Sequence, residues 1–309
     1  MITLENVTFA HRNQLRPALS NLSIAIQAGR MVMFIGPNGA GKTTLFRLFA
    51  GLHKCKQGQM RVHADWADPC GHGLDRRKTA CLLENPGVYD KLSAREYISF
   101  FRQFYPAPRA WREIELWAER LAFTQWDQRM KSFSLGEKQK VQILRCLCAH
   151  CSVLVLDEPT SHLDPFNREA FWSLMHEVNT QEGTGLLISS HQLAEIDEQA
   201  QELVLLDAGK VVWQGERSEL EEPFQETVWE LFDPLNPMLL QGLTKICPRL
   251  EMPENPCFIN ATGIHDRNEQ AQILQFLIEH NHIPRRIYVR NSSFKNHILE
   301  KFQNHATSI

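Results

Sequence analysis

The sequence predicts an α/β protein built on a parallel sheet, with an antiparallel β subdomain at the N-terminus, a helical insert and a small C-terminal α+β appendage. Residues 22–27 alternate between apolar and small or polar side chains, as a half-buried strand does. Uninterrupted apolar runs suit strands covered on both faces, and three occur, at residues 31–35, 153–156 and 185–188. Helical segments at 42–52 and 166–182 alternate with these runs, which is typical of crossover helices on a parallel sheet.

The rest of the chain divides into an insert and a tail. From about residue 86 to 150 the pattern is helical and rich in aromatic residues, which indicates a subdomain placed between sheet strands. After Gly215 the chain is acidic and punctuated by proline as far as about residue 256. A strand–helix–strand–helix pattern then follows, at residues 257–260, 269–280, 287–289 and 293–302. We therefore predict a first domain over 1–217, with its helical subdomain at about 86–150, and an accessory domain over 218–309.

Length and charge narrow the class of protein. The 309 residues are 43% hydrophobic and 22% charged, which is a globular balance. The net charge of −3 gives no general argument for a nucleic-acid partner, and none is expected. No apolar run approaches the roughly 18 residues that span a bilayer, and the N-terminus does not resemble a signal peptide. These features predict a soluble, non-secreted protein.

Three of the eight cysteines lie close together beside His150, which raises the possibility of a metal site. They are Cys146, Cys148 and Cys151. The second paired cluster of a zinc site is missing from the sequence around them, and they fall in an apolar helical pattern. We expect ordinary buried thiols and no disulfide framework.

A glycine-rich segment stands directly after the apolar run at 31–35 and directly before a helical segment, and it matches the phosphate-loop pattern. It consists of Gly36, Pro37, Asn38, Gly39, Ala40, Gly41, Lys42, Thr43 and Thr44. Glycines let the backbone approach phosphates, and the helix N-terminus adds positive partial charge. Lys42 would supply a charge to the β- and γ-phosphates, and the Thr43 hydroxyl can ligate magnesium. The alternative is a glycine-rich turn that binds nothing.

Two adjacent carboxylates, Asp157 and Glu158, end the apolar run at 153–156. Asp157 is expected beside the glycine-rich loop, where it can hold a magnesium ion through a water molecule. Glu158 is then placed to act as a base that polarises an attacking water. The alternative is a solvated strand end without a role.

Residues 133–140 contain Ser134 and Glu137 in a capping-box pattern that predicts the start of a helix. Together with the two motifs above, this segment resembles the signature of ABC-type ATPases. Further segments match in the order typical of that family, at residues 159–165, 188–191 and 207–215. The resemblance covers residues 1 to about 217. It implies a P-loop NTPase fold of the ABC type, with ATP and Mg²⁺ as ligands and with ATP hydrolysis as the activity.

The same resemblance implies roles for further residues. Ser134 and Gly136, at the N-terminus of the signature helix, are expected to meet the γ-phosphate of ATP held by a second copy. Asp164, in the loop at 159–165, is likewise expected at the nucleotide. His191 is expected to contact the γ-phosphate and to orient Glu158 and water. The helical insert and the loop at 84–92 are expected to meet a membrane partner.

The sequence departs from the family pattern at several positions. Leu135 and Glu137 replace the usual glycine and glutamine of the signature, and we expect Glu137 to fold back as a helix cap. Glu84 stands where the family has glutamine, and its carboxylate can still ligate magnesium. His11 occupies the place of the aromatic residue that stacks on the base. Residues 84–89, with the Ser-Leu-Gly signature, resemble the branch of exporters that serves antibiotic and bacteriocin efflux.

The main hypothesis is therefore an ATP-binding subunit of an ABC transporter that energises export through separate transmembrane subunits by ATP-driven dimer closure. Its expected partners are a second nucleotide-binding subunit, as a homodimer, and transmembrane permease subunits. The expected location is cytoplasmic, on the inner face of the cell membrane. The alternative is a non-transport ABC ATPase acting on nucleic acid or the ribosome, but the stretch from Lys42 to Asp157 is too short for a long coiled coil.

Overall fold

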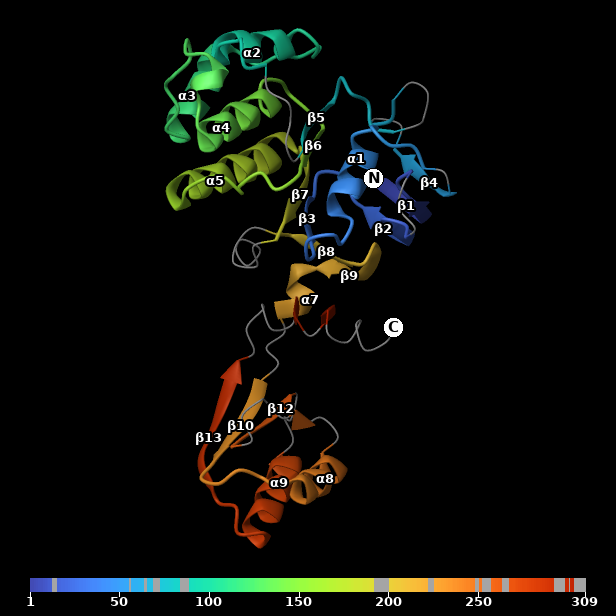
Figure 1. Cartoon of the computed structure of the whole chain (residues 1–309), viewed down its shortest axis with the longest axis vertical. Coiled ribbons are helices and arrows are strands. Elements are labelled where there is room, and N and C mark those ends of the chain that lie inside the picture. Colours follow the sequence, from blue (N-terminus) through green and yellow to red (C-terminus); the bar gives the residue numbers. More distant parts are fainter. Residues whose placement is uncertain are drawn as a thin grey trace. The chain divides into compact units, whose positions relative to one another are not determined.

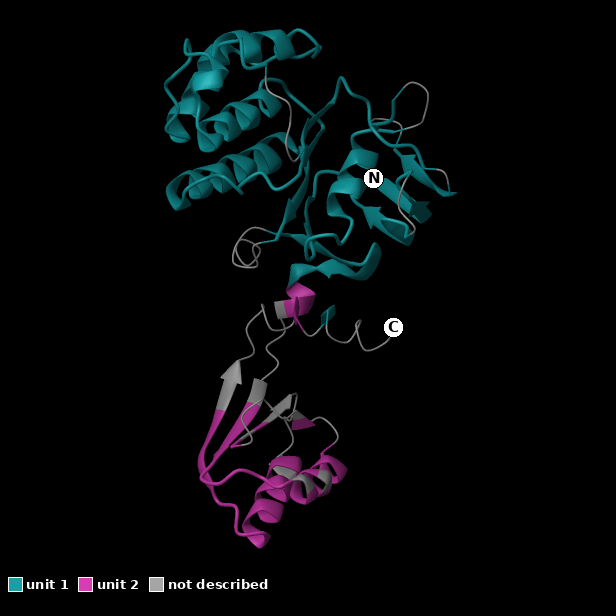
Figure 2. Ribbon diagram, viewed as in Figure 1, with its two compact units in different colours: residues 1–217, 301–309 teal, residues 218–300 magenta. Residues whose placement is uncertain are grey.

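The structure is a computed structural model, and it describes residues 1–302 with the exception of 13–15, 56, 64–65, 69–72, 84–88, 192–199, 222–224, 248–249, 252–256, 263–266, 292–297 and 300. The chain forms two compact units (Figure 2). The first contains residues 1–217 and 301–309, and the second contains residues 218–300.

The first unit is organised around a six-stranded sheet of order β5-β6-β7-β3-β8-β9. Its strands are β3 (Met31–Ile35), β5 (Thr79–Leu82), β6 (Val153–Leu156), β7 (Gly185–Ser190), β8 (Glu202–Asp207) and β9 (Lys210–Glu216). All neighbours pair in parallel except β8 and β9, which form an antiparallel hairpin. The predicted parallel sheet is confirmed, and its inner strands are fully buried because the apolar runs are covered on both faces.

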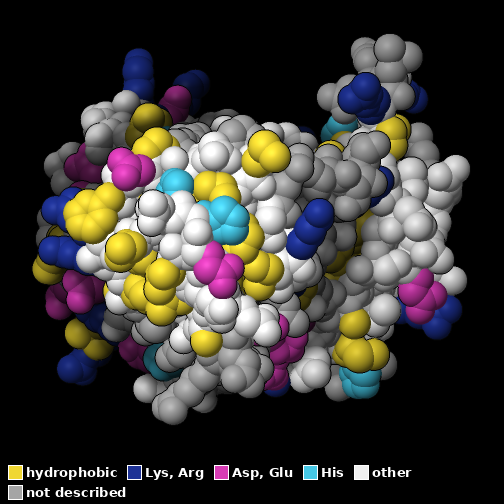
Figure 3. Space-filling view, turned by 90° about the horizontal axis from the view of Figure 1, so that it is seen from below, with side chains coloured by type: hydrophobic (Ala, Val, Ile, Leu, Met, Phe, Trp, Pro, Cys, Tyr) yellow, Lys and Arg dark blue, Asp and Glu magenta, His cyan; other side chains and the backbone are white. Residues whose placement is uncertain are grey.

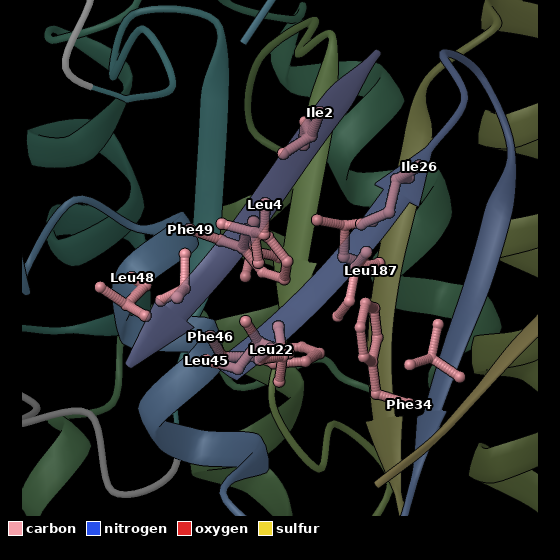
Figure 4. Packing of buried hydrophobic residues seen from close by; sticks show 14 of the residues in the cluster. Ile2, Leu4, Leu22, Ile26, Phe34, Leu45, Phe46, Leu48, Phe49 and Leu187 are labelled. Carbon is pink, nitrogen blue, oxygen red and sulfur yellow. The ribbon is translucent and has the colours of Figure 1, made fainter. Parts of the chain in front are cut away.

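A second, antiparallel sheet packs with helix α1 (Lys42–Phe49) against part of the first. It has the order β2-β1-β4, from β1 (Ile2–Phe9), β2 (Leu19–Ile26) and β4 (Gln57–Val62). One continuous core joins this sheet, helix α1 and the six-stranded sheet (Figure 4). Leu4, Phe46 and Leu187 represent the three layers in that core. The tight apolar packing fixes the start of α1 against the sheet, and therefore fixes the loop that precedes it.

The helical part lies together on the side of the six-stranded sheet away from β1 and β2 (Figure 1). It contains α2 (Ala94–Arg102), α3 (Trp111–Arg120), a short 3₁₀ helix (Met130–Ser132) and α4 (Leu135–Cys146), and α5 (Pro165–Glu182) lies beside them. The aromatic cluster in and just after α2 is divided between core and surface. Tyr97 is buried and donates its hydroxyl to Gln142 Oε1 at 3.1 Å, whereas Phe100 and Phe104 are exposed.

The cysteines of the segment that ends α4 are buried. Burial raises the pKa of the Cys148 thiol to about 12, which suits an unreactive, uncharged thiol. Among the residues that the structure describes, no three His, Cys, Asp or Glu side chains are grouped as metal ligands.

The second unit contains a four-stranded antiparallel sheet of order β11-β12-β10-β13. Its elements are β10 (Gln225–Leu231), α8 (Pro237–Ile246), β11 (Leu250–Glu251), β12 (Phe258–Thr262), α9 (Arg267–Glu279) and β13 (Pro284–Asn291), and α7 (Arg217–Glu221) precedes them. Trp229 and Ile273 belong to a separate core formed with α8 and α9.

This unit contains more regular structure than the sequence predicts. The proline-punctuated stretch after Gly215 includes β10, which pairs with both β12 and β13, and α8, which begins at Pro237. Proline at the first turn starts the helix, and the Asn236 side chain caps it. Most of the helix predicted at 293–302 lies outside the described residues.

No helix in the described part of the chain is both long and apolar enough to cross a membrane. Exposed apolar side chains nevertheless occur in the second unit, including Phe232, Met238 and Ile283. Figure 3 shows hydrophobic side chains interspersed with acidic and histidine side chains on one face of the molecule.

Candidate active site

The glycine-rich loop connects β3 to α1 and is shaped by close backbone contacts. A Cβ on Gly36 would collide with the carbonyl oxygen of Leu206, so only glycine fits there. Gly41 has a φ of 101° and stands at the N-cap of α1, which has no side-chain cap. The first N–H groups of α1 are therefore available to an anion, because no side chain satisfies them.

Lys42 lies in this loop with its side chain buried. Its ammonium donates to the carbonyl oxygen of Gly36 at 2.6 Å, and Nζ lies 3.8 Å from Glu158 Oε1. The positive charge is thus held between the glycine-rich loop and the end of β6, which are far apart in the sequence.

Asp157 follows β6 and is 1% exposed. Its Oδ1 accepts a hydrogen bond from Ser189 Oγ at 2.6 Å. Its Oδ2 is buried and has no hydrogen-bond partner in the described part of the chain. A buried carboxylate oxygen without a partner is costly, and a hard cation or a water bound to one would satisfy it. The donor set therefore fits magnesium, with Asp157 and the Thr43 hydroxyl as candidate ligands.

Glu158 has a left-handed backbone, with φ of 51°, which is uncommon for a residue other than glycine. Its N–H donates to Ser189 Oγ at 2.8 Å, and its Oε2 lies 2.6 Å from His191 Nδ1. The turned backbone and these two contacts direct the carboxylate toward Lys42. Ser189, buried in β7, links both carboxylate residues.

These residues line one cavity of about 1150 Å³. Its walls include Pro37, Asn38, Gly39, Ala40, Gly41, Lys42, Thr43, Thr44, Asp157, Glu158 and His191. His11 also lines the cavity, and its Nε2 lies 3.2 Å from Thr44 Oγ1. The fold therefore brings together segments that the sequence places up to 180 positions apart, from His11 to His191.

Three predicted site residues lie at other helix ends. Ser134 caps α4, Gly136 is in the first turn of α4, and Asp164 caps α5 by accepting from Asn167 N at 3.0 Å. Hydrogen bonds from Asn167 lower the pKa of Asp164, so it remains ionised at neutral pH. A Cβ on Gly136 would stand 2.9 Å from the carbonyl oxygen of His162. The predicted magnesium ligand Glu84 lies outside the described residues.

The expected folding back of Glu137 is observed. Its Oε2 accepts from Ser134 N at 2.8 Å, and its own N–H donates to Ser134 Oγ at 3.2 Å, which completes a capping box.

Sequence reasoning missed two residues of the site. Ser189 bridges Asp157 and Glu158, and Gln139 lines the cavity while donating to Pro159 O at 2.6 Å. The only sequence signal for Ser189 was a polar residue at the end of a buried apolar strand. Gln139 is buried on α4, where a helical pattern gives no reason to expect a polar contact with the loop after β6.

The fold and the cavity place the chain in the class of P-loop ATPases, and comparisons identify its family. A family model described as ABC transporter matches residues 19–161. A putative ABC transporter ATP-binding protein of Pyrococcus abyssi is 31% identical over 72% of this chain and 82% of its own length. The phosphonates import ATP-binding protein PhnC of Thiobacillus denitrificans is 29% identical over 74% of this chain and 92% of its own length.

A solved structure of the ATP-binding subunit of an ABC transporter superposes with a TM-score of 0.63 at 26% identity, over 71% of this chain and 91% of that one. This chain belongs to the family of ABC transporter ATP-binding proteins. It is an ATPase with the α/β fold of that family, including the antiparallel β subdomain.

Proposed function

We propose that this chain binds Mg²⁺-ATP in the cavity, hydrolyses it with Glu158 as the base, and uses dimer closure to energise export through separate transmembrane subunits. The observation that carries the proposal is the meeting of Lys42, Asp157, Glu158 and His191 on one cavity, from three separate segments of the chain. Each supplies a different part of the chemistry of phosphoryl transfer.

The loop from Gly36 to Thr44 would bind the phosphates. The N–H groups at the start of α1 and the Lys42 ammonium would offset their negative charge. Lys42 now donates to Gly36 O within the loop, so a short side-chain movement is sufficient to turn it toward a phosphate oxygen. His11 would contact the base or ribose, since it lines the same cavity.

Thr43 and Asp157 would hold the magnesium ion, and Glu84 is proposed as a further oxygen ligand. When bound, the ion neutralises charge on the β- and γ-phosphates. Ser189 contributes by donating to Asp157 Oδ1, which leaves Oδ2 as the free acceptor.

Glu158 would accept the proton of the attacking water, and His191 would hold the carboxylate in position. The 2.6 Å contact from His191 Nδ1 to Oε2 and the contact from Glu158 N to Ser189 Oγ restrain both ends of the glutamate. A base that is fixed before substrate arrives loses little entropy in the reaction.

The second copy would complete the site. Ser134, Gly136 and Asp164 lie at helix N-termini, which favour contact with an anion, but they do not line the cavity of their own chain. Two identical chains stacked head to tail would place these residues on each other's ATP. Because one chain carries both sets of residues, a homodimer would have two complete sites.

Transport through separate permease subunits is supported by the family, and export is supported by the resemblance of residues 84–89 and the Ser-Leu-Gly signature to exporters. A relative named for import of phosphonates shows that the family relationship alone does not set the direction. The proposed location is the inner face of the cell membrane, reached through the permease.

The first test is the Glu158→Gln variant. It removes the base and keeps the shape of the side chain, so ATP binding should persist while turnover falls about 10²–10⁴-fold. Turnover, nucleotide binding and ATP-dependent dimerisation are measured together, with Glu169→Gln on the exposed face of α5 as the control. Turnover close to wild type in Glu158→Gln would remove Glu158 from the role of base.

The second test identifies the partner and the direction. The tagged chain is purified from its native cell in mild detergent, and a stoichiometric polytopic membrane protein should accompany it. Inside-out vesicles containing that complex should then accumulate substrates in an ATP-dependent manner if the complex exports them. Recovery with ribosomes or DNA instead of a membrane protein would contradict the transport role.

A further inference from the structure

The chain contains two capping boxes of the same sequence type in its helical part. At α2, Ser93 Oγ accepts from Glu96 N at 3.2 Å, and Glu96 Oε2 accepts from Ser93 N at 2.9 Å. At α4, the equivalent distances for Ser134 and Glu137 are 3.2 Å and 2.8 Å. The two boxes therefore stabilise their helices in the same way.

The α4 box has two contacts in addition. The Ser134 hydroxyl donates to Glu137 Oε2 at 2.9 Å, and Gln125 Nε2 donates to Glu137 Oε1 at 2.8 Å. A hydroxyl has one proton to donate, so Ser134 cannot donate to a phosphate oxygen while it donates to Glu137. Gln125 holds the other carboxylate oxygen, so the carboxylate is fixed from both sides.

Glu137 also places a full negative charge at the N-terminus of α4. Glu137 is ionised at neutral pH, as carboxyl groups are, and hydrogen bonds from the Ser134 backbone and side chain lower its pKa further. Lys138 pairs with Asp90 at 3.3 Å, and Lys140 donates to Ala122 O at 3.3 Å, so the charge of Lys140 acts on Glu137 only at longer range. In the described part of the chain, Glu137 forms hydrogen bonds but no ion pair. Leu135 beside it is 67% exposed, so this helix end faces outward.

We propose that Glu137 is a positioning residue that opposes ATP-driven dimer closure, both by holding the Ser134 hydroxyl proton and by placing a negative charge where the partner's γ-phosphate must approach. The proposal rests on the proposed function, in which Ser134 meets ATP held by a second copy. The same carboxylate therefore stabilises α4 within the chain and weakens the contact between chains. Closure requires the Ser134 hydroxyl to turn from Glu137 to the phosphate.

The Glu137→Gln variant tests this. A glutamine whose oxygen takes the place of Oε2 still accepts from Ser134 N, so the cap persists without the charge. That neutral oxygen holds the Ser134 hydroxyl proton less strongly than a carboxylate oxygen does, so the proton is easier to release. The variant is made in the Glu158→Gln background, where ATP binding without turnover holds the dimer. The dimer dissociation constant in saturating Mg²⁺-ATP is measured by sedimentation at low salt, and it should fall about tenfold.

The salt dependence distinguishes the effect from a change in folding. The gain from Glu137→Gln should shrink as ionic strength rises, because salt screens the repulsion between carboxylate and phosphate. Glu96→Gln in the same background is the matched control, and it should leave the dissociation constant unchanged because the α2 cap, unlike Ser134, is not proposed to meet the partner's ATP.

Each outcome bears on one of the two proposals. If Glu158→Gln alone does not dimerise with ATP, the proposed function fails at the dimer. If Glu158→Gln dimerises but adding Glu137→Gln does not lower the dimer dissociation constant, then Glu137 does not oppose closure. The same conclusion follows if adding Glu96→Gln lowers the constant equally. A gain that is independent of salt would remove the charge from the explanation and would also contradict the proposal.

Discussion

Two regions of the first unit that are proposed to bind ATP differ in how their polar groups are arranged in the single chain. At the carboxyl ends of β3, β6 and β7, the loop lysine, both carboxylates and the histidine already contact one another or share a hydroxyl. At the N-terminus of α4, by contrast, the Ser134 hydroxyl and the Glu137 carboxylate form hydrogen bonds with each other. We call the first the assembled region, because separate segments of the chain build it. We call the second the self-closed region, because its polar groups bond to each other within one helical turn.

The physical reason for the difference is burial. Asp157 and Ser189 are almost fully buried and must find partners within the chain. Ser134 is exposed and can exchange one partner for another at little cost. In the proposed function, this arrangement would let one chain bind ATP alone and would leave dimer closure as a separate step.

After Glu158→Gln, the largest expected effect comes from changing the assembled region at Asp157. Asp157→Asn keeps the acceptor for Ser189 and removes the charge that a magnesium ion requires, so turnover should fall about 10²–10³-fold. ATPase assays over a range of Mg²⁺ concentrations should show a raised magnesium requirement. Asp127→Asn, at an exposed position of the helical part, is the control and should behave as wild type. An unchanged magnesium requirement in Asp157→Asn would exclude Asp157 as a ligand of the ion.

The sequence predicts the cap of the self-closed region and most residues of the assembled one. The glycine-rich loop, Asp157 and Glu158 are recognisable because each motif is local and joins a buried strand to a polar end. Ser189 is not recognisable in this way, because its importance arises only when β7 pairs beside β6 and brings its hydroxyl to both carboxylates. The cap at Ser134 and Glu137 is predictable because both residues lie within one helical turn.

Prediction from sequence was weakest in the second unit. The sequence indicated β12, α9 and β13 but not β10, since its residues lie in an acidic, proline-containing stretch and alternate poorly. β10 is nevertheless an inner strand of its sheet, with β12 and β13 on either side. Its position depends on pairing with strands that come later in the chain, which no local pattern records.

A smaller effect is expected from reshaping the glycine-rich loop. Gly36→Ala places a Cβ against the carbonyl oxygen of Leu206, where backbone must move, and should lower the free energy of unfolding by about 3 kcal/mol. Gly39→Ala is the matched variant, because Gly39 has a φ of 84° and open space around its Cβ position. It should lower the free energy of unfolding by only about 1 kcal/mol, from backbone strain.

Denaturant unfolding of both variants measures the difference. If Gly39→Ala proved the more damaging, the shape of the loop would depend on its backbone conformation more than on its contact with β8. Equal losses would show that relaxing the close contact at Gly36 costs no more than the backbone strain at Gly39.

The smallest expected effect concerns the pH dependence of the α4 cap. The pKa of Glu137 is lowered in the folded chain, first by the hydrogen bond from Ser134 N and then by that from the Ser134 side chain. A carboxylate of this kind contributes its full stabilisation above its unfolded pKa of about 4.3 and loses it as the pH falls through the lower folded value. At neutral pH, Glu137→Gln should therefore lower the free energy of unfolding by about 0.5 kcal/mol, as for a charge at a helix N-terminus.

Urea unfolding of wild type and Glu137→Gln at pH values from 7 downward checks this sign. The difference between the two should stay constant to about pH 5 and then shrink, because protonation removes the charge from wild type alone. A difference that grew on acidification would mean that the carboxylate destabilises the folded chain. In that case the Glu137 charge would oppose folding as well as the proposed closure. The contrast between a charge that stabilises α4 and weakens the contact between chains would then not hold.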